Sequence, residues 1–134
     1  MALIELIEFK ALGDERGCLI SLEQKYNIPF ELRRVYYLYG TEEGASRGFH
    51  AHKALEQVAI CVAGRCRFVL DDGRNREEIV LDSPEKGLYI GNNIWREMYD
   101  FSTDCVLLVL ASELYDESDY IRDYAEYLSV ANGA

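Results

Sequence analysis

Hydrophobic residues along this chain fall into short runs separated by turn residues. The runs cover residues 35–39, 57–62, 66–70, 78–81, 87–91 and 105–110. Their β-branched and aromatic residues favour extended backbone, whereas the Gly and Asp residues between them favour turns. Short strands at such regular spacing predict an all-β sandwich or barrel.

The C-terminal part of the chain has a helical pattern instead. Apolar side chains recur at helical spacing at Tyr120, Ile121, Tyr124, Tyr127 and Leu128. Ser118 is a suitable N-cap, and Asp119 lies beside it in the predicted first turn. We therefore expect one short C-terminal helix after the strands.

Length and composition indicate one domain over residues 1–134. The chain is 49% hydrophobic, and no Pro/Gly/Ser-rich linker divides it. Glu5 and Glu8 interrupt the first apolar run, which argues against a signal peptide, and no run is long enough to span a bilayer. We expect a cytoplasmic protein that has no membrane partner.

The charge of the chain restricts its partners. A formal net charge of −10 argues against nucleic acid, because binding phosphates along a backbone requires a basic face. A small phosphorylated ligand is still compatible with this charge. Four cations lie near the two histidines in the sequence, at Arg33, Arg34, Arg47 and Lys53.

The four cysteines show no metal-binding or disulfide pattern. Cys18, Cys61, Cys66 and Cys105 form no CxxC pair, and the last three lie in apolar runs. In such runs a thiol behaves as a small hydrophobic group, so we expect free, buried cysteines.

The two histidines are the main candidates for chemistry. His50 and His52 are the only histidines of the chain and lie two residues apart in the motif RGFHAHK, residues 47–53. On an extended strand they project to the same face. The pair could hold a metal, transfer protons, or do neither.

The histidine region resembles the first signature of the cupin barrel. Gly44, His50, His52, Gln57 and Gly64 have its spacing, although cupins normally have Glu at the position of Gln57. The segment GLYIGNNIWR, residues 87–96, resembles the second signature, with Arg96 where the third metal histidine is expected. The resemblance implies a cupin fold, the double-stranded β-helix or jelly-roll barrel.

The two departures from the cupin pattern argue against a metal. A cupin site offers three imidazoles and a carboxylate, whereas this chain offers two imidazoles, the amide of Gln57 and the guanidinium of Arg96. Glu56 could supply the carboxylate only if the strand slipped by one residue. We expect no metal, and no organic cofactor, because no GxGxxG or Walker-type loop is present.

Without a metal, the pair is suited to proton transfer beside a ketone. An imidazole whose pKa has its ordinary value of about 6.5 is neutral near physiological pH and can remove a proton from carbon there. The enolate then requires hydrogen-bond donors near its oxygen, and Tyr37 and Arg47 are suitable types.

The chain as a whole resembles the dTDP-4-oxo-6-deoxy-D-glucose 3,4-ketoisomerases, metal-free cupins related in fold to the dTDP-4-dehydrorhamnose 3,5-epimerases. The similar segments are IPF at 28–30, RVYY at 34–37, RGFHAHK at 47–53, LEQV at 55–58, LDDG at 70–73, and the tail from residue 100 to 122.

This resemblance implies a reaction and its residues. The family removes the C3 proton of the dTDP-4-oxo-6-deoxy sugar, forms an enediol and protonates C4, giving a 3-oxo sugar for a later aminotransferase in amino-sugar synthesis for a glycan or natural product. By position, His50 would be the carbon base, with His52 and Tyr37 assisting, and Arg47 would contact the sugar or diphosphate. Trp95 would line the pocket. Family members are homodimers in which the N-terminal strand, here residues 4–9, pairs with the partner subunit.

Two further positions bear on the product. The segment DERGCL, residues 14–19, is similar to the galacto-forming type, in which arginine, here Arg16, precedes glycine. The related enzymes have histidine where this chain has Arg96. We place Arg16, Arg96, Gln57 and Lys53 with the substrate-binding residues and favour a galacto product over a gluco product.

Two alternatives remain. A non-catalytic cupin that binds a nucleotide sugar would share the barrel and the arginines without needing a base. A metal-dependent cupin enzyme would instead contain stoichiometric metal.

Overall fold

The computed structural model describes residues 3–132, and strands follow one another along almost all of them. They are β1 (Glu5–Glu8), β2 (Leu12–Asp14), β3 (Gly17–Leu19), β4 (Arg34–Tyr39), β5 (Arg47–His52), β6 (Gln57–Ala63), β7 (Cys66–Asp71), β8 (Arg76–Leu81), β9 (Lys86–Ile90), β10 (Trp95–Tyr99), β11 (Val106–Ala111) and β12 (Tyr120–Ile121). A 3-10 turn, Glu117–Asp119, precedes β12, and helix α1, Tyr124–Ala131, follows it.

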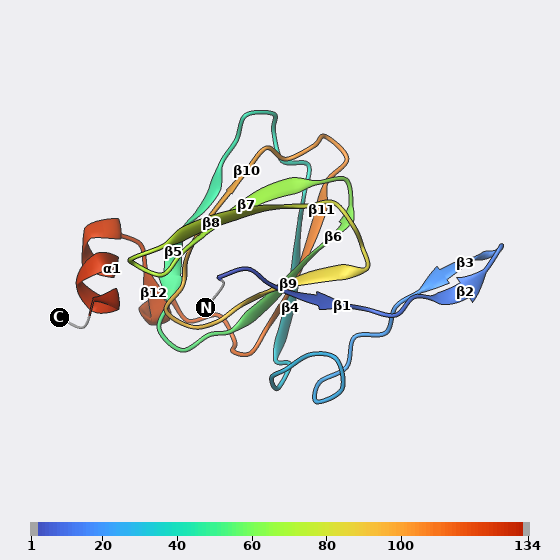
Figure 1. The fold of residues 1–134 in the computed structure, drawn as a ribbon, viewed down its shortest axis with the longest axis horizontal. Coiled ribbons are helices and arrows are strands. Elements are labelled where there is room, and N and C mark those ends of the chain that lie inside the picture. The colour runs from blue at the N-terminus through green and yellow to red at the C-terminus, as the bar shows by residue number, and fades with distance from the viewer. Residues whose placement is uncertain (1–2, 133–134) are drawn as a thin grey trace.

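Two five-stranded antiparallel sheets form the body of the molecule (Figure 1). One has the order β1-β9-β6-β11-β4, and the other has the order β12-β5-β10-β7-β8. Alternate side chains of both sheets meet in one core, which includes Ala59 and Leu107 from the first sheet and Phe68 and Leu70 from the second. The predicted all-β cupin architecture with a short C-terminal helix is confirmed.

Other segments cover the outer faces of both sheets. Ile28 and Phe30, in the long connection before β4, pack on Val58 and Ile60 of the first sheet. On the second sheet, α1 and β12 cover a separate cluster formed by Ala51, Trp95, Ile121 and Tyr127. The side chains of the central strands are therefore buried on both faces.

The C-terminal segment differs from the sequence expectation. Tyr120 and Ile121 lie in β12, paired with His52 and Ala51, rather than in a helix. The helix starts four residues later, and Asp123 is its N-cap, accepting a hydrogen bond from the Glu126 backbone N–H at 3.1 Å. Pairing with the edge of β5 satisfies the backbone N–H and C=O groups of this segment. The helical spacing of its apolar residues does not reveal this pairing.

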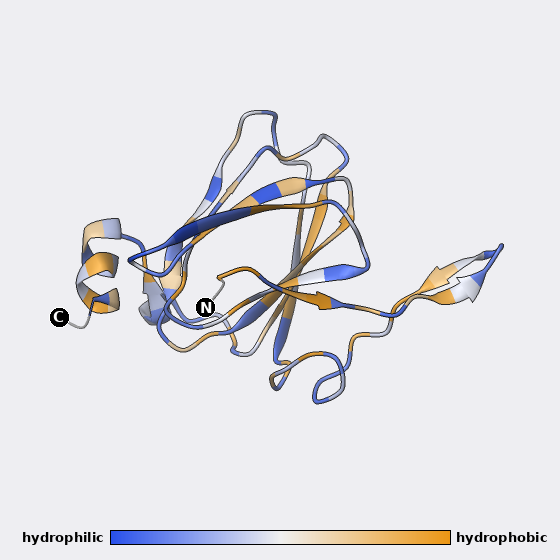
Figure 2. Cartoon of the chain, viewed as in Figure 1, coloured by the Kyte–Doolittle hydropathy of each residue, from blue (hydrophilic) through white to orange (hydrophobic). Residues whose placement is uncertain are grey.

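A hairpin of β2 and β3 projects away from the two sheets (Figure 1). Hydrophobic residues lie on both of its strands (Figure 2), and Leu12 and Leu19 are 55% and 59% exposed. The preceding strand, β1, pairs with β9 of the same chain. Exchange of residues 4–9 between subunits therefore stays a prediction.

The cysteines follow expectation except for one. Cys61, Cys66 and Cys105 are free and buried, whereas Cys18, in the projecting hairpin, is free and exposed. Among residues 3–132, no helix is long and apolar enough to cross a membrane.

Candidate active site

The two histidines lie on one face of β5, as predicted. His50 and His52 point to the interior between the sheets, and Ala51 between them points to the outer cluster beneath α1. The imidazole centroids are 4.9 Å apart and the rings are nearly perpendicular. His52 is only 1% exposed, whereas His50 is half-buried.

A β-bulge immediately before His50 sets this orientation. His50 pairs with Arg96, but Gly48 pairs with Glu97, so Phe49 is an extra residue on β5. Phe49 has a φ of 58°, in the left-handed region that is unfavourable for a non-glycine residue. The bulge thus places His50 and Arg96 directly opposite each other on the inner face.

Arg96 and Gln57 occupy the interior beside the histidines. The Arg96 side chain is 1% exposed, and its Nη1 donates a hydrogen bond to Gln57 Oε1 while its Nη2 donates to Ile94 O at 2.9 Å. Gln57 Nε2 donates to the Tyr36 hydroxyl oxygen at 2.9 Å. Because that oxygen accepts from Gln57, the Tyr36 hydroxyl proton is available for another acceptor.

Asp119 and Tyr120 close this interior from the C-terminal side. The Tyr120 ring centroid lies 4.3 Å from that of His52 and 5.0 Å from that of His50. One carboxylate oxygen of Asp119 lies 3.3 Å from His52 Nδ1, and the carboxylate also accepts from the Ala54 backbone N–H at 2.9 Å. Sequence reasoning assigned both residues to a helix and so missed their position beside the histidines.

The electrostatics of the interior keep both imidazoles neutral. Burial, followed by the charge of Arg96, lowers the pKa of His50 to about 4 and that of His52 to about 2. Burial also lowers the pKa of Arg96 to about 10, so this side chain remains a cation at neutral pH. Burial raises the pKa of Tyr36, which therefore keeps its proton.

Several polar atoms of the site make no hydrogen bond of good geometry among the described residues, although Asp119 lies close to His52 Nδ1. They are His50 Nδ1, both ring nitrogens of His52, Arg96 Nε and Arg34 Nε. Buried polar atoms are usually paired, so this group of neutral acceptors and cationic donors is suited to a bound polar molecule.

Comparisons with known proteins show the family to which this chain belongs. The family model described as "FdtA: WxcM-like, C-terminal" matches residues 2–132. The TDP-4-oxo-6-deoxy-alpha-D-glucose-3,4-oxoisomerase of Aneurinibacillus thermoaerophilus is 54% identical over 123 residues, which are 92% of this chain and 88% of that protein. The chain belongs to the sugar 3,4-ketoisomerase family.

Solved structures of this family have the same fold. A 3,4-ketoisomerase from Helicobacter canadensis is 52% identical, with a TM-score of 0.93 over 96% of this chain and 97% of its own. QdtA, a sugar 3,4-ketoisomerase from Thermoanaerobacterium thermosaccharolyticum, was solved in complex with TDP. It is 47% identical, with a TM-score of 0.94 over 97% of this chain and 95% of its own. The family resemblance predicted from the sequence is confirmed.

A pocket of about 450 Å³ opens beside His52 in this ketoisomerase. Arg33, Arg34, Asp119 and Tyr120 contribute to its lining. Of the predicted cationic residues, Arg47 is exposed at the start of β5, and Lys53, just after β5, donates from Nζ to Ser118 O at 3.1 Å. The pocket therefore combines one histidine and two arginines with three acidic residues, Glu113, Asp116 and Asp119.

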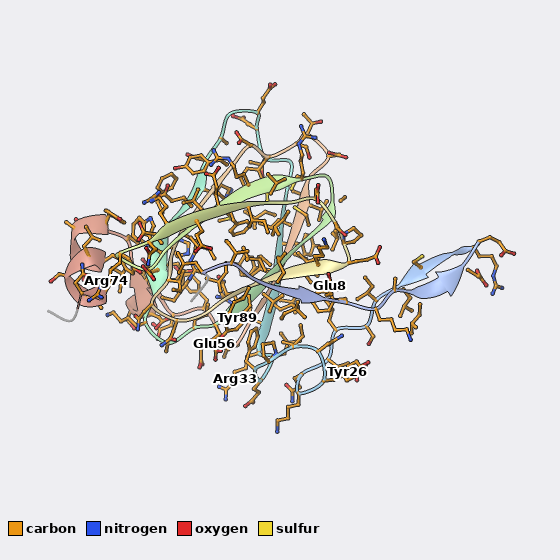
Figure 3. All side chains as sticks on the ribbon, viewed as in Figure 1. Glu8, Tyr26, Arg33, Glu56, Arg74 and Tyr89 are labelled. Atoms are coloured by element: carbon orange, nitrogen blue, oxygen red, sulfur yellow. The ribbon has the colours of Figure 1, made fainter. Side chains whose placement is uncertain are left out.

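The interior of the ketoisomerase does not fit a cupin metal. The guanidinium of Arg96 lies where a metal ligand is expected, and it donates to Gln57, whose amide replaces the usual carboxylate. Glu56 does not supply one either, because its carboxylate accepts a hydrogen bond from the Tyr89 hydroxyl (Figure 3).

The structure does not bring Tyr37 to the histidine pair. On β4 the side chains alternate, so Tyr36 points inward toward Gln57 and Tyr37 points outward, 62% exposed. Residues 35–39 are apolar or aromatic on both faces, so the sequence alone could not distinguish the inner tyrosine. We replace Tyr37 by Tyr36 as the phenol of this site.

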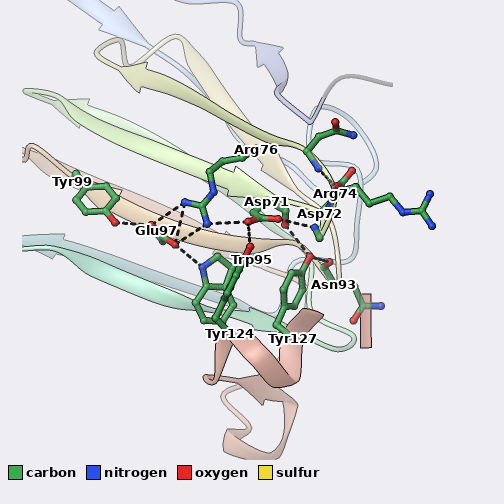
Figure 4. A network of polar contacts seen from close by, with 12 residues as sticks. Asp71, Asp72, Arg74, Arg76, Asn93, Trp95, Glu97, Tyr99, Tyr124 and Tyr127 are labelled. Atoms are coloured by element: carbon green, nitrogen blue, oxygen red, sulfur yellow. Dashed lines mark hydrogen bonds and ion pairs between the residues drawn. The ribbon is translucent and has the colours of Figure 1, made fainter. Parts of the chain in front are cut away.

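Trp95 also lies outside the pocket. It is 2% exposed on the outer face of β10, against Tyr124 and Tyr127 of α1. Its indole nitrogen donates to Glu97 at 2.8 Å within a polar network that includes Asp71 and Arg76 (Figure 4). Neighbouring strand residues face opposite sides, so Arg96 is in the site and Trp95 is not.

Arg16 lies far from the histidines of its own chain in the fold. It is at the turn of the projecting hairpin, where its guanidinium pairs with Asp14 at 2.7 Å and its side chain is 86% exposed. A role for Arg16 at a substrate would require a partner subunit, and it stays a prediction.

Proposed function

We propose that this enzyme converts dTDP-4-oxo-6-deoxy-α-D-glucose into a dTDP-3-oxo-6-deoxyhexose without a metal or organic cofactor. The observation that supports this most is the pair of neutral histidines facing a buried cation. The names of the related proteins support the substrate, since the Thermoanaerobacterium enzyme was solved with TDP and a variant of it with TDP-4-keto-6-deoxyglucose.

In the proposed mechanism, His50 removes the proton from C3. A neutral imidazole accepts a proton, and burial together with Arg96 keeps His50 neutral. The electrons of the C–H bond form the enediolate, whose oxygen was the C4 ketone. A proton returned to C4 then leaves the ketone at C3.

We assign the transfer of protons between the two sugar oxygens to His52 and Tyr36. His52 is held between Tyr120 and Asp119, and the Tyr36 hydroxyl can donate because its oxygen already accepts from Gln57. Hydrogen bonds of this kind contribute most where charge develops on an oxygen.

Arg96 stabilises the enediolate in this proposal. It is a buried cation with no carboxylate within ion-pair distance among residues 3–132, so its charge is available to the negative charge that forms during the reaction. The same charge disfavours a metal cation in that place.

Cations outside the interior bind the diphosphate in our proposal. Arg33 and Arg34 line the pocket beside His52, and Arg47 lies exposed on the same strand as the histidines. Arginine forms two parallel hydrogen bonds with phosphate oxygens.

NMR of the reaction in D₂O tests this function. Deuterium at C4 of a 3-oxo product would support it, whereas unchanged substrate would refute it. The H4–H5 coupling of the product made in H₂O, where C4 keeps a proton, distinguishes the galacto product, which we propose from the segment around Arg16, from the gluco product.

His50→Asn separates catalysis from binding. We expect turnover to fall by about 10²-fold or more while TDP-sugar binding is kept, because the base is lost but the cations remain. A wild-type protein that binds the sugar and never converts it would favour a non-catalytic cupin. Stoichiometric iron or manganese in the active purified protein would favour a metal-dependent cupin.

We also propose a homodimer formed by the projecting hairpin and by exchange of the N-terminal strand. A two-stranded hairpin alone is marginally stable in water, and within residues 3–132 β2 and β3 pair only with each other. Exposed apolar residues on the hairpin, Leu12 and Leu19, and on β4, Val35 and Tyr37, are suited to burial against a second copy.

A further inference from the structure

Three of the four cysteines meet inside the barrel, two of them five residues apart in the sequence and the third 44 residues from Cys61. Cys61 lies in β6, Cys66 begins β7 and Cys105 directly precedes β11. Cys61 Sγ is 3.5 Å from Cys66 Sγ and 3.6 Å from Cys105 Sγ, and the three sulfurs lie within 4.8 Å of one another. We call these three residues the thiol cluster.

The thiol cluster is separate from the histidine site. Gln57, Ala59 and Cys61 alternate along β6 with their side chains in the same interior, and four residues of extended strand span about 13 Å. The cluster cysteines are 0%, 0% and 3% exposed. The proposed isomerisation does not use them.

The sulfur positions fit one central atom. Sulfur ligands bind zinc at a Zn–S distance of about 2.3 Å. Three sulfurs arranged evenly around a central atom in their plane are then about 4 Å from one another. The two separations from Cys61, 3.5 and 3.6 Å, are close to this value and the third is at most 4.8 Å, so only small shifts are needed. Within residues 3–132 no histidine or carboxylate joins the group, and a donor set of sulfur alone favours a soft, thiophilic partner.

The surroundings of the thiol cluster favour an adduct without net charge. Phe68, Phe101 and Leu107 belong to the same buried core, where an unpaired charge is costly. Burial raises the pKa of the Cys105 thiol to about 12, so this thiol carries its proton at neutral pH. Three thiolates around zinc would leave one negative charge and around cuprous copper two, whereas around trivalent arsenic they leave none.

We propose that Cys61, Cys66 and Cys105 form a binding site for trivalent arsenic, taken up from arsenous acid. Each sulfur replaces one hydroxyl group on arsenic, so three As–O bonds break and three As–S bonds form. The three thiol protons leave with the three hydroxyls as water, and the oxidation state of arsenic does not change. The neutral product suits the apolar core.

Native mass spectrometry and thermal unfolding of the reduced, full-length protein with arsenous acid test this site. We expect one arsenic atom per chain and a rise in Tm, because a ligand bound to the native state stabilises it. Since the sulfurs are buried, the experiment is done both on the native protein and on protein refolded with arsenous acid. Zinc and cuprous ions are tested in parallel.

Matched variants locate the bound arsenic. Cys66→Ser and Cys105→Ser each remove one sulfur and should weaken binding at least about tenfold, a free-energy change of about 1.4 kcal/mol. Cys18→Ser removes the exposed cysteine and should bind like the wild type. If a cluster variant does not fold, removal of arsenic from the wild type by a small dithiol should return Tm to its starting value.

Three outcomes would overturn the proposal. They are the absence of an adduct with either procedure, an adduct that Cys66→Ser and Cys105→Ser both retain, or tighter binding of zinc or cuprous ions than of arsenic. Isomerase turnover should stay unchanged in the arsenic-bound protein, because the thiol cluster lies away from the histidines.

Discussion

Burial and the charge of Arg96 together keep the histidine pair neutral. Arg96 is buried opposite His50 on the neighbouring strand, and after burial itself its charge is the largest influence lowering the pKa of both imidazoles. A metal in a cupin site also requires the imidazoles to be neutral. The guanidinium of Arg96 favours the same neutral form, but it cannot itself coordinate a metal. One residue therefore changes the chemistry of the site.

The pH dependence of catalysis should reflect this. The pKa of His50 in the free enzyme is lowered to about 4, so we expect the acid limb of kcat/KM to lie well below the usual value of about 6.5. Arg96→Gln removes the cation and should move that limb toward 6.5. Identical profiles for both proteins, with limbs near 6.5, would contradict the assignment.

The same shift predicts a pH dependence of stability. The pKa of His50 and of His52 is lower in the folded than in the unfolded chain, so the unfolded chain binds more protons as pH falls below about 6.5. We expect the free energy of unfolding to have its full value above about pH 6.5 and to decrease steadily as the pH falls toward 4. Denaturant unfolding at several pH values measures this, and a His50→Asn, His52→Asn double variant should show a shallower decrease.

Tyrosine substitutions on β4 distinguish the inner from the outer phenol. We expect Tyr36→Phe to lower kcat by about 10²-fold, because a positioned proton donor is lost, and Tyr37→Phe to leave kcat nearly unchanged in the same assay. The opposite order would restore Tyr37 as the site residue.

At the scale of elements, periodicity predicted the central strands well and the C-terminal segment poorly. Four strands, β6, β7, β9 and β11, are short, largely buried and largely apolar runs. The turns on either side leave room for a strand in each run. β10 contains Arg96 and Glu97 and has little hydrophobic pattern. β12 is only two residues long and forms because β5 presents a free edge to it, which is a tertiary effect.

The attachment of α1 to the second sheet depends on Trp95. Its ring packs on Tyr124 and Tyr127, and its N–H bonds to Glu97. We expect Trp95→Phe to lower the free energy of unfolding by about 1–3 kcal/mol, from the lost hydrogen bond and the cavity. KM for the TDP-sugar should be unchanged in steady-state kinetics. A raised KM with unchanged stability would place Trp95 at the substrate instead.

At the scale of the whole molecule, the proposed dimer depends on the projecting hairpin. Leu12→Glu with Leu19→Glu should convert a dimer into a monomer, measured by light scattering, because two charges would be buried at the interface. Val80→Glu is a matched control, since Val80 is 48% exposed on β8 in the other sheet. A wild type that is monomeric, or a double variant that stays dimeric, would contradict this assembly.

The place of the projecting hairpin relative to the histidines could not be predicted from residue patterns alone. The spacing of His50, His52, Gln57 and Arg96 predicted that these side chains share one interior, because strand alternation determines which side chains share a face. Their roles at a substrate stay predictions. The position of Arg16 depends on where a hairpin lies, which no local pattern determines.

The unpaired charge of Arg96 has a consequence for inhibitor design. A neutral ketone gives this cation little to bind, whereas a compound with a fixed negative charge at the position of the C4 oxygen would neutralise it directly. Such a transition-state analogue should bind at least about 10²-fold more tightly than the substrate. That gain in affinity should largely disappear in an enzyme with a neutral residue at position 96.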